Sequence, residues 1–387
     1  MIDDLMIITS YYPPEIGAAS NRIYHLSEGL KQNYNVTVVT QLPNYPTGKI
    51  FKDYKKKFLS KSHQDGIVVN RLWVYPSVSK NKIVRLFAML SYSFSLIWFF
   101  IWHRIPNKVI IQSPPLLVSF TCLLFLRSKK RQLILNVSDL WPSAGLELGA
   151  LKKGIGYTFL KKIERFNYKN ANLIMGQSNE ILAHIKQITT QPKLFLYRNY
   201  PDINIPKSQP QQIVKEKLTV VYAGLLGVAQ GIYKLCNNLD YSHIEFHIYG
   251  SGAEEENIKD FIKEHPNLPL FFHGRLDRAE LHQEIVKYDV TIIPLLNRIY
   301  GAVPSKIFEY AKLGLPMLYF GGGEAETLID TYKLGWIAES GNYTNLNTVI
   351  ATIDKSKIDC NFREEIKQKA LIHFDFNTQL TALKRVL

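Results

Sequence analysis

Residues 303–317 read VPSKIFEYAKLGLPM, a short helix-like segment that runs directly into an apolar strand. Pro304 and Ser305 are residue types favoured at a helix start, and the Gly-Leu-Pro that follows ends the helix before the strand begins. Lys306 and Glu309 lie three residues apart and therefore share one face of the helix. This stretch predicts one helix–strand repeat of an α/β domain, with a charged pair at the head of its helix.

The same alternation extends over the whole chain. Strand-like runs rich in Val, Ile and Leu occur at 5–10, 35–40, 67–74, 108–113, 132–137 and 172–178, and again at 218–224, 243–252, 268–274, 288–295, 315–323 and 335–340. Such runs are typical of parallel strands that are buried on both faces. Segments between them, such as 18–32 and 156–171, carry helical spacing. The sequence predicts an α/β chain with two Rossmann-like, doubly wound parallel-sheet domains.

A break separates the two sets of strands. Residues 198–212 contain three prolines and several amides without periodicity. We predict an N-terminal domain over 1–203, a linker over 204–212 and a C-terminal domain over 213–370. A last helical segment follows at about 371–387.

The chain of 387 residues has a formal net charge of +14, and basic clusters stand out in its first half, at 52–61 (KDYKKKFLSK) and 127–131 (RSKKR). This charge indicates an anionic partner, such as a phosphorylated ligand, an acidic membrane face or nucleic acid, unless the clusters are only solvated loops. No nucleic-acid-binding motif accompanies it, so we expect no nucleic acid partner. Cys122, Cys236 and Cys360 are too widely spaced for a disulfide framework or a zinc site, which favours a reducing cytoplasm.

Residues 83–102 form an apolar run with one charge, Arg85, and three serines. Its length is just sufficient for a membrane span, but the serines favour a buried or membrane-dipping helix. A second apolar run at 114–127 is too short to span and ends at the basic cluster. Apolar residues beside cations are typical of a protein that lies on an anionic membrane, although a core helix with a solvated cap fits the same pattern. An integral membrane protein built on residues 83–126 is a further alternative.

Several strand-like runs of the second half end in glycine. In an open α/β sheet, ligands bind beyond the carboxyl ends of the strands, and glycine there lets backbone N–H groups approach a phosphate. Tight turns need glycine as well, so only the set as a whole favours a nucleotide site. The chain has neither a dinucleotide-binding G-x-G-x-x-G with a downstream acidic residue nor a P-loop. The predicted contacts are Gly224, Gly227, Gly250, Gly252 and Gly274.

Lys306 and Glu309 fit the same interpretation. At a helix start, Ser305 and Lys306 lie beside free backbone N–H groups, where a diphosphate can bind. Glu309, one turn deeper, can accept hydrogen bonds from the vicinal hydroxyls of a ribose. The alternative is a surface ion pair between the two side chains, which is worth only a few tenths of a kcal/mol.

The stretch PSKIFEYAKLGLPM resembles the P-S-K-x-x-E-Y-x-x-x-G-x-P motif of glycosyltransferase family 4. More narrowly, the chain resembles a branch of bacterial O-antigen and capsule enzymes that includes assigned fucosamine transferases. Further stretches match the family's landmarks in order: SYYPPEIGAASNRIYHLSEGL, NVSDLWPSAGLELG, VVYAGLLGVAQGIYKL, FHIYGSGAEEENI and LFFHGRLDRAEL. The resemblance covers nearly the whole chain. It implies a GT-B fold, in which two Rossmann-like domains face each other across a cleft and the C-terminal helix returns to the first domain.

The resemblance also implies roles for single residues. Lys306 should hold the donor diphosphate and Glu309 the ribose, on the C-terminal domain. Gly17 looks like the loop of the N-terminal domain that closes on the diphosphate, unless it only makes a tight turn. Asp139 stands where many relatives carry a histidine or an acidic residue, so we expect it to act as a base or to orient the acceptor, unless it caps the following Trp-Pro turn. Glu15 is a weaker candidate for the same work.

The sequence departs from the family at two places. Gly301 occupies a position where many relatives carry a glutamate, so contacts to the donor sugar must come from elsewhere, for example from the backbone of 301–303. The loop GLLGVAQG lacks the cations of other branches. Arg275 is the candidate to supply this charge, unless it is a plain surface arginine.

We therefore expect a retaining glycosyltransferase that moves a hexose or N-acetylhexosamine from a nucleotide-diphosphate donor, by default UDP-linked, in surface polysaccharide synthesis. The expected acceptor is a polyprenyl-diphosphate-linked saccharide, and the expected location is the cytoplasm, peripheral to the inner face of the membrane. No aspartate pair or His/Cys cluster has ligand spacing, so we expect no metal and no cofactor. The alternatives are a nucleotide-sugar 2-epimerase of the same build and a basic membrane- or nucleic-acid-binding protein without catalysis.

Overall fold

The computed structural model describes residues 2–45, 47–77, 81–201, 203, 216–296 and 298–387; the predicted linker at 204–212 lies outside them. Contacts between α-carbons divide the chain into two compact units. Unit 1 consists of Met1–Asn199 and Phe376–Leu387, and unit 2 of Tyr200–Asp375. The chain thus leaves unit 1 and returns to it with its last residues.

Unit 1 contains one eight-stranded sheet. Its strands are β1 (Asp3–Ile8), β2 (Tyr34–Gln41), β3 (Leu59–Gln64), β4 (Ile67–Leu72), β5 (Lys108–Ser113), β6 (Gln132–Val137), β7 (Leu173–Gly176) and β8 (Lys193–Leu196). They lie in the order β3-β4-β2-β1-β5-β6-β7-β8. All neighbours run parallel except β3 and β4, which pair antiparallel at one edge. The sequence did not predict β3 or β8.

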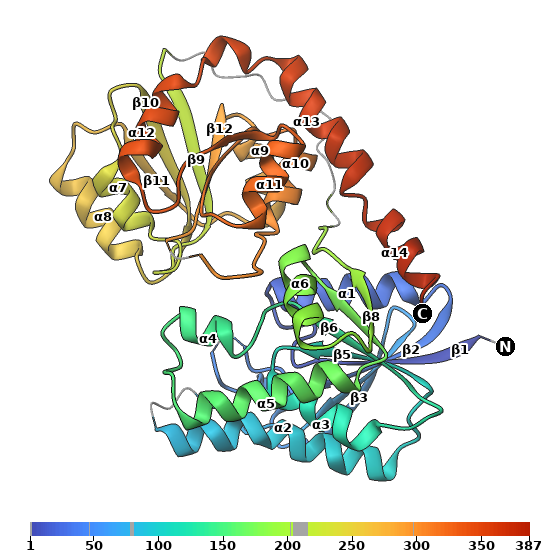
Figure 1. The fold of residues 1–387 in the computed structure, drawn as a ribbon. Helices are drawn as coiled ribbons and strands as arrows, with labels where there is room; N and C mark the ends of the chain where they lie inside the picture. The colour runs from blue at the N-terminus through green and yellow to red at the C-terminus, as the bar shows by residue number, and fades with distance from the viewer. Residues whose placement is uncertain (1, 46, 78–80, 202, 204–215, 297) are drawn as a thin grey trace. The chain divides into compact units, whose positions relative to one another are not determined.

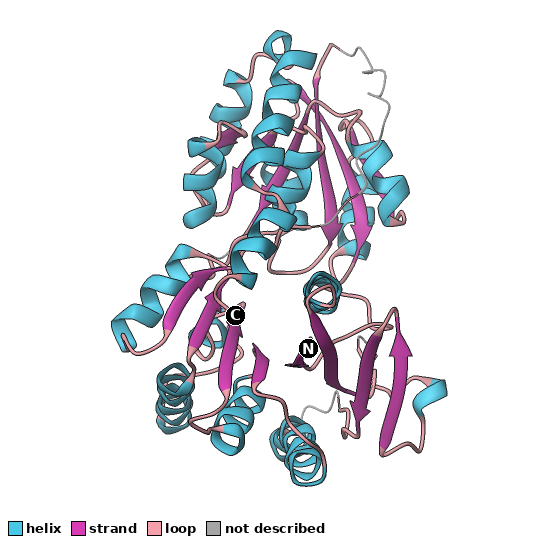
Figure 2. Ribbon diagram, turned by 90° about the vertical axis from the view of Figure 1, so that its right-hand side faces the viewer, coloured by secondary structure: helices cyan, strands magenta, loops and turns pink. Residues whose placement is uncertain are grey.

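Helices cover both faces of this sheet (Figures 1 and 2). They are α1 (Ala18–Leu30), α2 (Lys82–Trp102), α3 (Leu116–Leu126), α4 (Ser143–Glu147), α5 (Ile155–Asn170), α6 (Asn179–Ile188) and α14 (Phe376–Lys384), with a short 3-10 turn η1 (Lys52–Tyr54). On one face, Leu26 of α1 and Leu380 and Leu383 of α14 pack into the core with the strands. On the other face, α2 contacts α3 and α3 contacts α5.

The predicted apolar helix at 83–102 is α2, and its polar residues face inward. Ser91 and Ser95 are buried and donate hydrogen bonds to the backbone carbonyls of Ala88 and Trp73. The buried Tyr92 hydroxyl donates to the carbonyl of Thr9 at 2.8 Å. Ser95 and Tyr92 therefore anchor the helix to the residues that follow β4 and β1. Among the residues that the structure describes, no helix combines the length and hydropathy of a membrane span.

Unit 2 contains a six-stranded parallel sheet. Its strands are β9 (Leu218–Leu225), β10 (Ile244–Ser251), β11 (Leu270–Gly274), β12 (Val290–Pro294), β13 (Met317–Phe320) and β14 (Gly335–Ile337). Their order is β11-β10-β9-β12-β13-β14. From β9 the chain adds β10 and β11 on one side, and it then crosses to the other side of β9 to add β12, β13 and β14. The switch point of this doubly wound sheet, where ligands bind in such folds, therefore lies between β9 and β12.

Strand β9 shows why the sheet is buried on both faces. Val220 and Tyr222 pack into one core, whereas Val221 and Ala223 pack into the other, because successive side chains point to opposite faces. The helices of unit 2 are α7 (Ile232–Asn238), α8 (Glu255–Glu264), α9 (Arg278–Ile285), α10 (Lys306–Lys312), α11 (Glu324–Thr331), α12 (Tyr343–Thr352) and α13 (Cys360–His373), with the 3-10 turn η2 (Lys355–Lys357). The predicted C-terminal helix is divided between α13 and α14.

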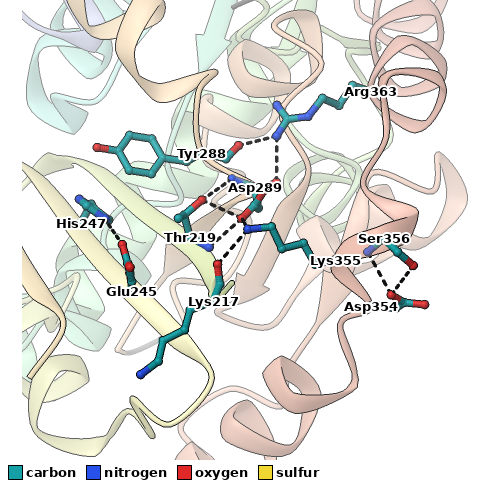
Figure 3. Close-up of polar contacts among 10 residues, drawn as sticks. All are labelled: Lys217, Thr219, Glu245, His247, Tyr288, Asp289, Asp354, Lys355, Ser356 and Arg363. Atoms are coloured by element: carbon teal, nitrogen blue, oxygen red, sulfur yellow. Dashed lines mark hydrogen bonds and ion pairs between the residues drawn. The ribbon is translucent and has the colours of Figure 1, made fainter. Parts of the chain in front are cut away.

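Asp289 ties the start of β12 to three other segments (Figure 3). Its Oδ2 accepts hydrogen bonds from the backbone N and the Oγ1 of Thr219, both at 2.8 Å. Lys355 of η2 forms an ion pair with the same oxygen at 3.1 Å. Arg363 of α13 donates to the carbonyl oxygen of Asp289 at 3.4 Å and to that of Tyr288. This network lies at the amino end of the strands, away from the switch point, and stabilises the sheet there.

Candidate active site

The carboxyl ends of β9 and β10 approach each other too closely for side chains. Gly224 and Gly250 are register partners. A Cβ on Gly250 would lie 1.9 Å from the carbonyl oxygen of Gly224, and one on Gly252 would lie 2.4 Å from that of Leu226. Backbone atoms cannot move aside as a flexible side chain can, so the strand packing itself requires Gly250 and Gly252. Their contact with a phosphate stays a prediction.

Lys306, the first residue of α10, reaches this strand end. Its ammonium donates a hydrogen bond to the carbonyl oxygen of Ala223 at 2.5 Å and lies 4.5 Å from the centre of the Tyr222 ring. A Cβ on Gly224 would lie 2.0 Å from the Lys306 Nζ, so this glycine makes room for the lysine. Burial lowers the pKa of Lys306 to about 8, against the opposing effect of Glu309. At pH 7 the ammonium is mainly charged and places positive charge at the switch point.

Glu309 lies one turn further along α10 and does not pair with Lys306. Its Oε1 accepts hydrogen bonds from the Nε of Arg278 at 3.1 Å and the Nε2 of His282 at 2.6 Å. Burial would raise the pKa of Glu309, but His282 and Arg278 outweigh it, so this pKa lies below its usual value. Within the described part of the chain, both contacts fall on Oε1. Because its pKa is lowered, the carboxylate of Glu309 is ionised. Its Oε2 can accept a further hydrogen bond.

The other predicted donor contacts differ in their surroundings. Ser305 precedes α10, but its hydroxyl makes no capping bond to the helix. A Cβ on Gly227 would lie 2.7 Å from the flexible side chain of Gln230 and in ordinary contact with Leu225, and one on Gly274 would meet no atom within 4 Å. Arg275 is exposed and, among the described residues, makes no hydrogen bond or ion pair. Gly301 is buried with a φ of 84°.

Asp139, in unit 1, follows β6 and is partly exposed. Its Oδ2 accepts a hydrogen bond from the Ser138 hydroxyl at 3.3 Å. Burial raises the pKa of Asp139, and the charge of the buried Arg22 on α1 counteracts this rise. The backbone N–H of Trp141 bonds to the backbone carbonyl of Asp139, so its carboxylate does not cap this N–H. A carboxylate with a raised pKa is suited to accept a proton near neutral pH.

Glu15 is buried in the loop before α1. Its Oε1 accepts hydrogen bonds from the backbone N–H groups of Asn44 and Tyr45, at 2.8 and 2.9 Å. This half of the carboxylate holds the loop after β2 in place. Gly17 is the residue before α1, and a Cβ there would make ordinary contact with the Tyr45 ring at 3.5 Å. Burial raises the pKa of Glu15, although the two backbone bonds and the Arg71 charge oppose it.

No group of three or more His, Cys, Asp or Glu side chains among the described residues is placed to hold a metal ion.

Comparisons with solved structures decide the fold. The sucrose-phosphate synthase of Thermosynechococcus elongatus is similar over 99% of this chain and 98% of its own, with a TM-score of 0.74 and 13% identity. HepE of Anabaena, solved with UDP and glucose, is similar over 99% of both chains, with a TM-score of 0.67 and 15% identity. WaaG, a glycosyltransferase involved in lipopolysaccharide biosynthesis, is similar over 99% of both chains, with a TM-score of 0.67 and 12% identity. The fold is GT-B.

Sequence comparison points the same way for the C-terminal part of this GT-B chain. Residues 205–371, less than half of the chain, match the family described as Glycosyl transferases group 1. No curated protein matches the chain. The α/β fold with two Rossmann-like parallel-sheet domains is confirmed, and the family match supports a glycosyltransferase. The narrower resemblance to O-antigen and fucosamine enzymes stays a prediction.

Three residues that act on the candidate site of the GT-B chain were missed in the sequence: Arg278, His282 and Arg22. Arg278 and His282 lie 31 and 27 residues before Glu309 and meet it only because α9 packs beside α10. Their i, i+4 spacing places them on one helix face, which is the one local signal they carry. Arg22 reaches Gln177, which follows β7, with an Nη1–Oε1 distance of 3.1 Å, and its charge acts on Asp139. Nothing in the sequence joins these segments.

Proposed function

We propose that this chain is a retaining glycosyltransferase that uses a nucleotide-diphosphate sugar, with UDP as the nucleotide. The observation that carries the proposal is the Lys306 ammonium at the switch point of the sheet, beside the glycines near the carboxyl ends of β9 and β10. Fixed positive charge at that place suits a pyrophosphate. The family match of residues 205–371 and the GT-B fold support the same reaction class. HepE and TarM were both solved with UDP, which supports this nucleotide.

The donor is held by unit 2 in this proposal. Lys306 contacts the diphosphate, and the Oε2 of Glu309 accepts hydrogen bonds from the ribose hydroxyls, since its Oε1 is already occupied by Arg278 and His282. Gly274, where a Cβ would meet no atom within 4 Å, lets the nucleotide approach the backbone. Gly301 carries no side chain, so the donor sugar is held by backbone groups near it.

The chemical step is departure of a nucleoside diphosphate from the sugar. Negative charge grows on the phosphate oxygens as the bond breaks, and a preorganised cation stabilises it. Lys306 supplies that charge, and transfer needs no metal or cofactor. Attack from the face that the leaving group vacates retains the configuration, and no protein nucleophile takes part. Asp139 in unit 1 accepts the proton of the acceptor hydroxyl, and its raised pKa favours this role.

The donor site gives a direct test. UDP at about a hundred times its dissociation constant should raise the free energy of unfolding by about 2.7 kcal/mol, measured as a higher melting temperature. A panel of UDP-, GDP-, dTDP- and CMP-sugars should identify the nucleotide. Because Lys306 loses its charge as the pH rises through its pKa of about 8, the shift caused by UDP should be smaller at pH 9 than at pH 7. No shift with any nucleotide, or an equal shift at both pH values, would contradict the donor site.

We propose further that the acceptor is a polyprenyl-diphosphate-linked saccharide in surface polysaccharide synthesis, and that unit 1 rests on the inner, anionic face of the membrane. The outer side of α2 carries large exposed apolar residues, including Phe94 and Trp102, while its serines face the sheet. Leu124 and Phe125 are exposed at the end of α3, next to the basic cluster at 127–131. Apolar and cationic groups together match an anionic lipid surface.

Membrane binding can be measured by flotation with phosphatidylglycerol vesicles. We expect the protein to float with the vesicles and to dissociate as salt is added. The pair Lys129→Glu and Lys130→Glu should weaken binding by about tenfold or more, since each basic residue near the surface contributes about 1 kcal/mol. Trp102→Glu should also weaken it, whereas Ile372→Glu, at an equally exposed position of unit 2, should not. Equal flotation of all variants, or none by the wild type, would argue against the docking face.

A further inference from the structure

A cavity of about 330 Å³ lies in unit 1, beside the loop that joins β1 to α1. Its walls are formed by Tyr11, by residues 15–20 and by Tyr45. The rings of Tyr11 and Tyr45 meet edge to face, with centres 5.7 Å apart. The cavity therefore has two aromatic walls and is lined on another side by the first turn of α1.

Two residues of the cavity lining each have one buried oxygen atom that makes no hydrogen bond to the described part of the chain. These atoms are the Oε2 of Glu15 and the Oγ of Ser20, in residues that are only 2% and 1% exposed. The other carboxylate oxygen of Glu15 is fully used by two backbone N–H groups. A buried polar atom without a partner is unfavourable, and a ligand that donates hydrogen bonds to it removes that penalty.

The charge of the lining selects the kind of ligand. Glu15 contributes a carboxyl group, and no cation lines the cavity among the described residues. Arg71 is the cation whose charge acts on Glu15, and it partly offsets the rise in the pKa of Glu15 that burial causes. Its guanidinium, however, donates to the Pro13 carbonyl, Ser62 and Gln64. A diphosphate in the cavity would meet a carboxylate without a compensating cation, whereas hydroxyl groups would find an acceptor.

We propose that this cavity binds an uncharged sugar ring of the acceptor, with its hydroxyls donating to Glu15 and its apolar face against the tyrosines. The inference rests on the proposed function, because it names the acceptor group at unit 1. Glu15 is then a specificity-determining residue and not the base. The expectation that the loop at Gly17 closes on the donor diphosphate stays a separate prediction.

The test compares Glu15→Gln with the wild type, using a panel of neutral methyl hexopyranosides and their 2-acetamido forms. Gln keeps an oxygen for the two backbone N–H groups but places an NH₂ donor where Oε2 accepts, so the fold is preserved. The dissociation constant of the best glycoside, followed by saturation-transfer NMR, should rise about tenfold or more. Ser20→Ala should raise it severalfold. Asp53→Asn removes an exposed carboxylate of unit 1 and should leave it unchanged.

Inorganic pyrophosphate is the opposing probe. If the cavity is an anion site, Glu15→Gln removes a negative charge and must tighten pyrophosphate binding, which would overturn the proposal. Unchanged glycoside binding in both Glu15→Gln and Ser20→Ala would also overturn it. A wild-type chain that binds UDP but no glycoside would refute the proposed cavity and leave the proposed donor site standing. Absence of UDP binding would count against the proposed function alone.

Discussion

Replacing Lys306 with alanine should lower the rate of sugar transfer by about 100- to 1000-fold, the usual cost of removing one group that stabilises charge in a transition state. The ammonium is the positive group at the strand end where the diphosphate leaves. The fold should survive, because the Ala223 carbonyl keeps a hydrogen bond from the Tyr310 hydroxyl at 3.0 Å. Release of the nucleoside diphosphate measures the effect, and the melting temperature reports the fold.

Lys312 offers a matched control on the same helix. Its ammonium donates to the carbonyl of Pro201 at 2.8 Å, away from the strand end. Lys312→Ala should therefore change stability and leave the transfer rate close to that of the wild type. Lys306→Met, which keeps the aliphatic stem, should be as inactive as Lys306→Ala. Normal turnover by either Lys306 variant would show that this ammonium has no part in the reaction.

Asp289→Ala should destabilise unit 2 by about 3 kcal/mol or more. The substitution removes a buried carboxylate and leaves the N–H and hydroxyl of Thr219 without their acceptor. Lys355 also loses its ion-pair partner, but because Lys355 is partly exposed, this loss contributes less to the change in the free energy of unfolding. Urea unfolding followed by far-UV circular dichroism should show the loss as a lower midpoint.

Asp354 is the comparison within the same region (Figure 3). It is an exposed carboxylate that, within the described residues, bonds to the backbone N and hydroxyl of Ser356 and forms a loose pair with Lys357. Asp354→Ala should leave the midpoint near that of the wild type. If Asp289→Ala unfolds at the same urea concentration as Asp354→Ala, the Asp289 network does not stabilise the sheet.

The strands that the sequence predicts well are those that carry an apolar side chain on both faces. Strand β9 is an example, since Val220 and Val221 are both buried on opposite faces and leave a continuous apolar run. Strand β3, LSKSHQ, has no such run because it is an edge strand held by backbone pairing with β4. Its first three residues belong to the basic cluster at 52–61, which begins with the 3-10 turn η1.

In the candidate site, too, local patterns could be predicted from the sequence and long-range contacts could not. Lys306 and Glu309 could be placed because helix spacing and a family motif fix them relative to each other. Their partners could not, since Ala223 lies 83 residues before Lys306 and joins it only when β9 and α10 pack together. The alternative of an ion pair between Lys306 and Glu309 was open in the sequence. In the structure the Lys306 ammonium bonds to the Ala223 carbonyl instead, and the Oε1 of Glu309 is paired with Arg278 and His282.

The split build of unit 1 affects how the chain folds as it is synthesised. Leu380 and Leu383 are buried in its core, and Gln379 exchanges two hydrogen bonds with the backbone of Arg198, 181 residues earlier. All of unit 2 emerges from the ribosome between these partners. Unit 2 can therefore fold while unit 1 still lacks α14 on one face of its sheet. The apolar surface that α14 covers stays exposed until the last residues are synthesised. Premature termination anywhere in unit 2 would leave the first unit unable to finish its core.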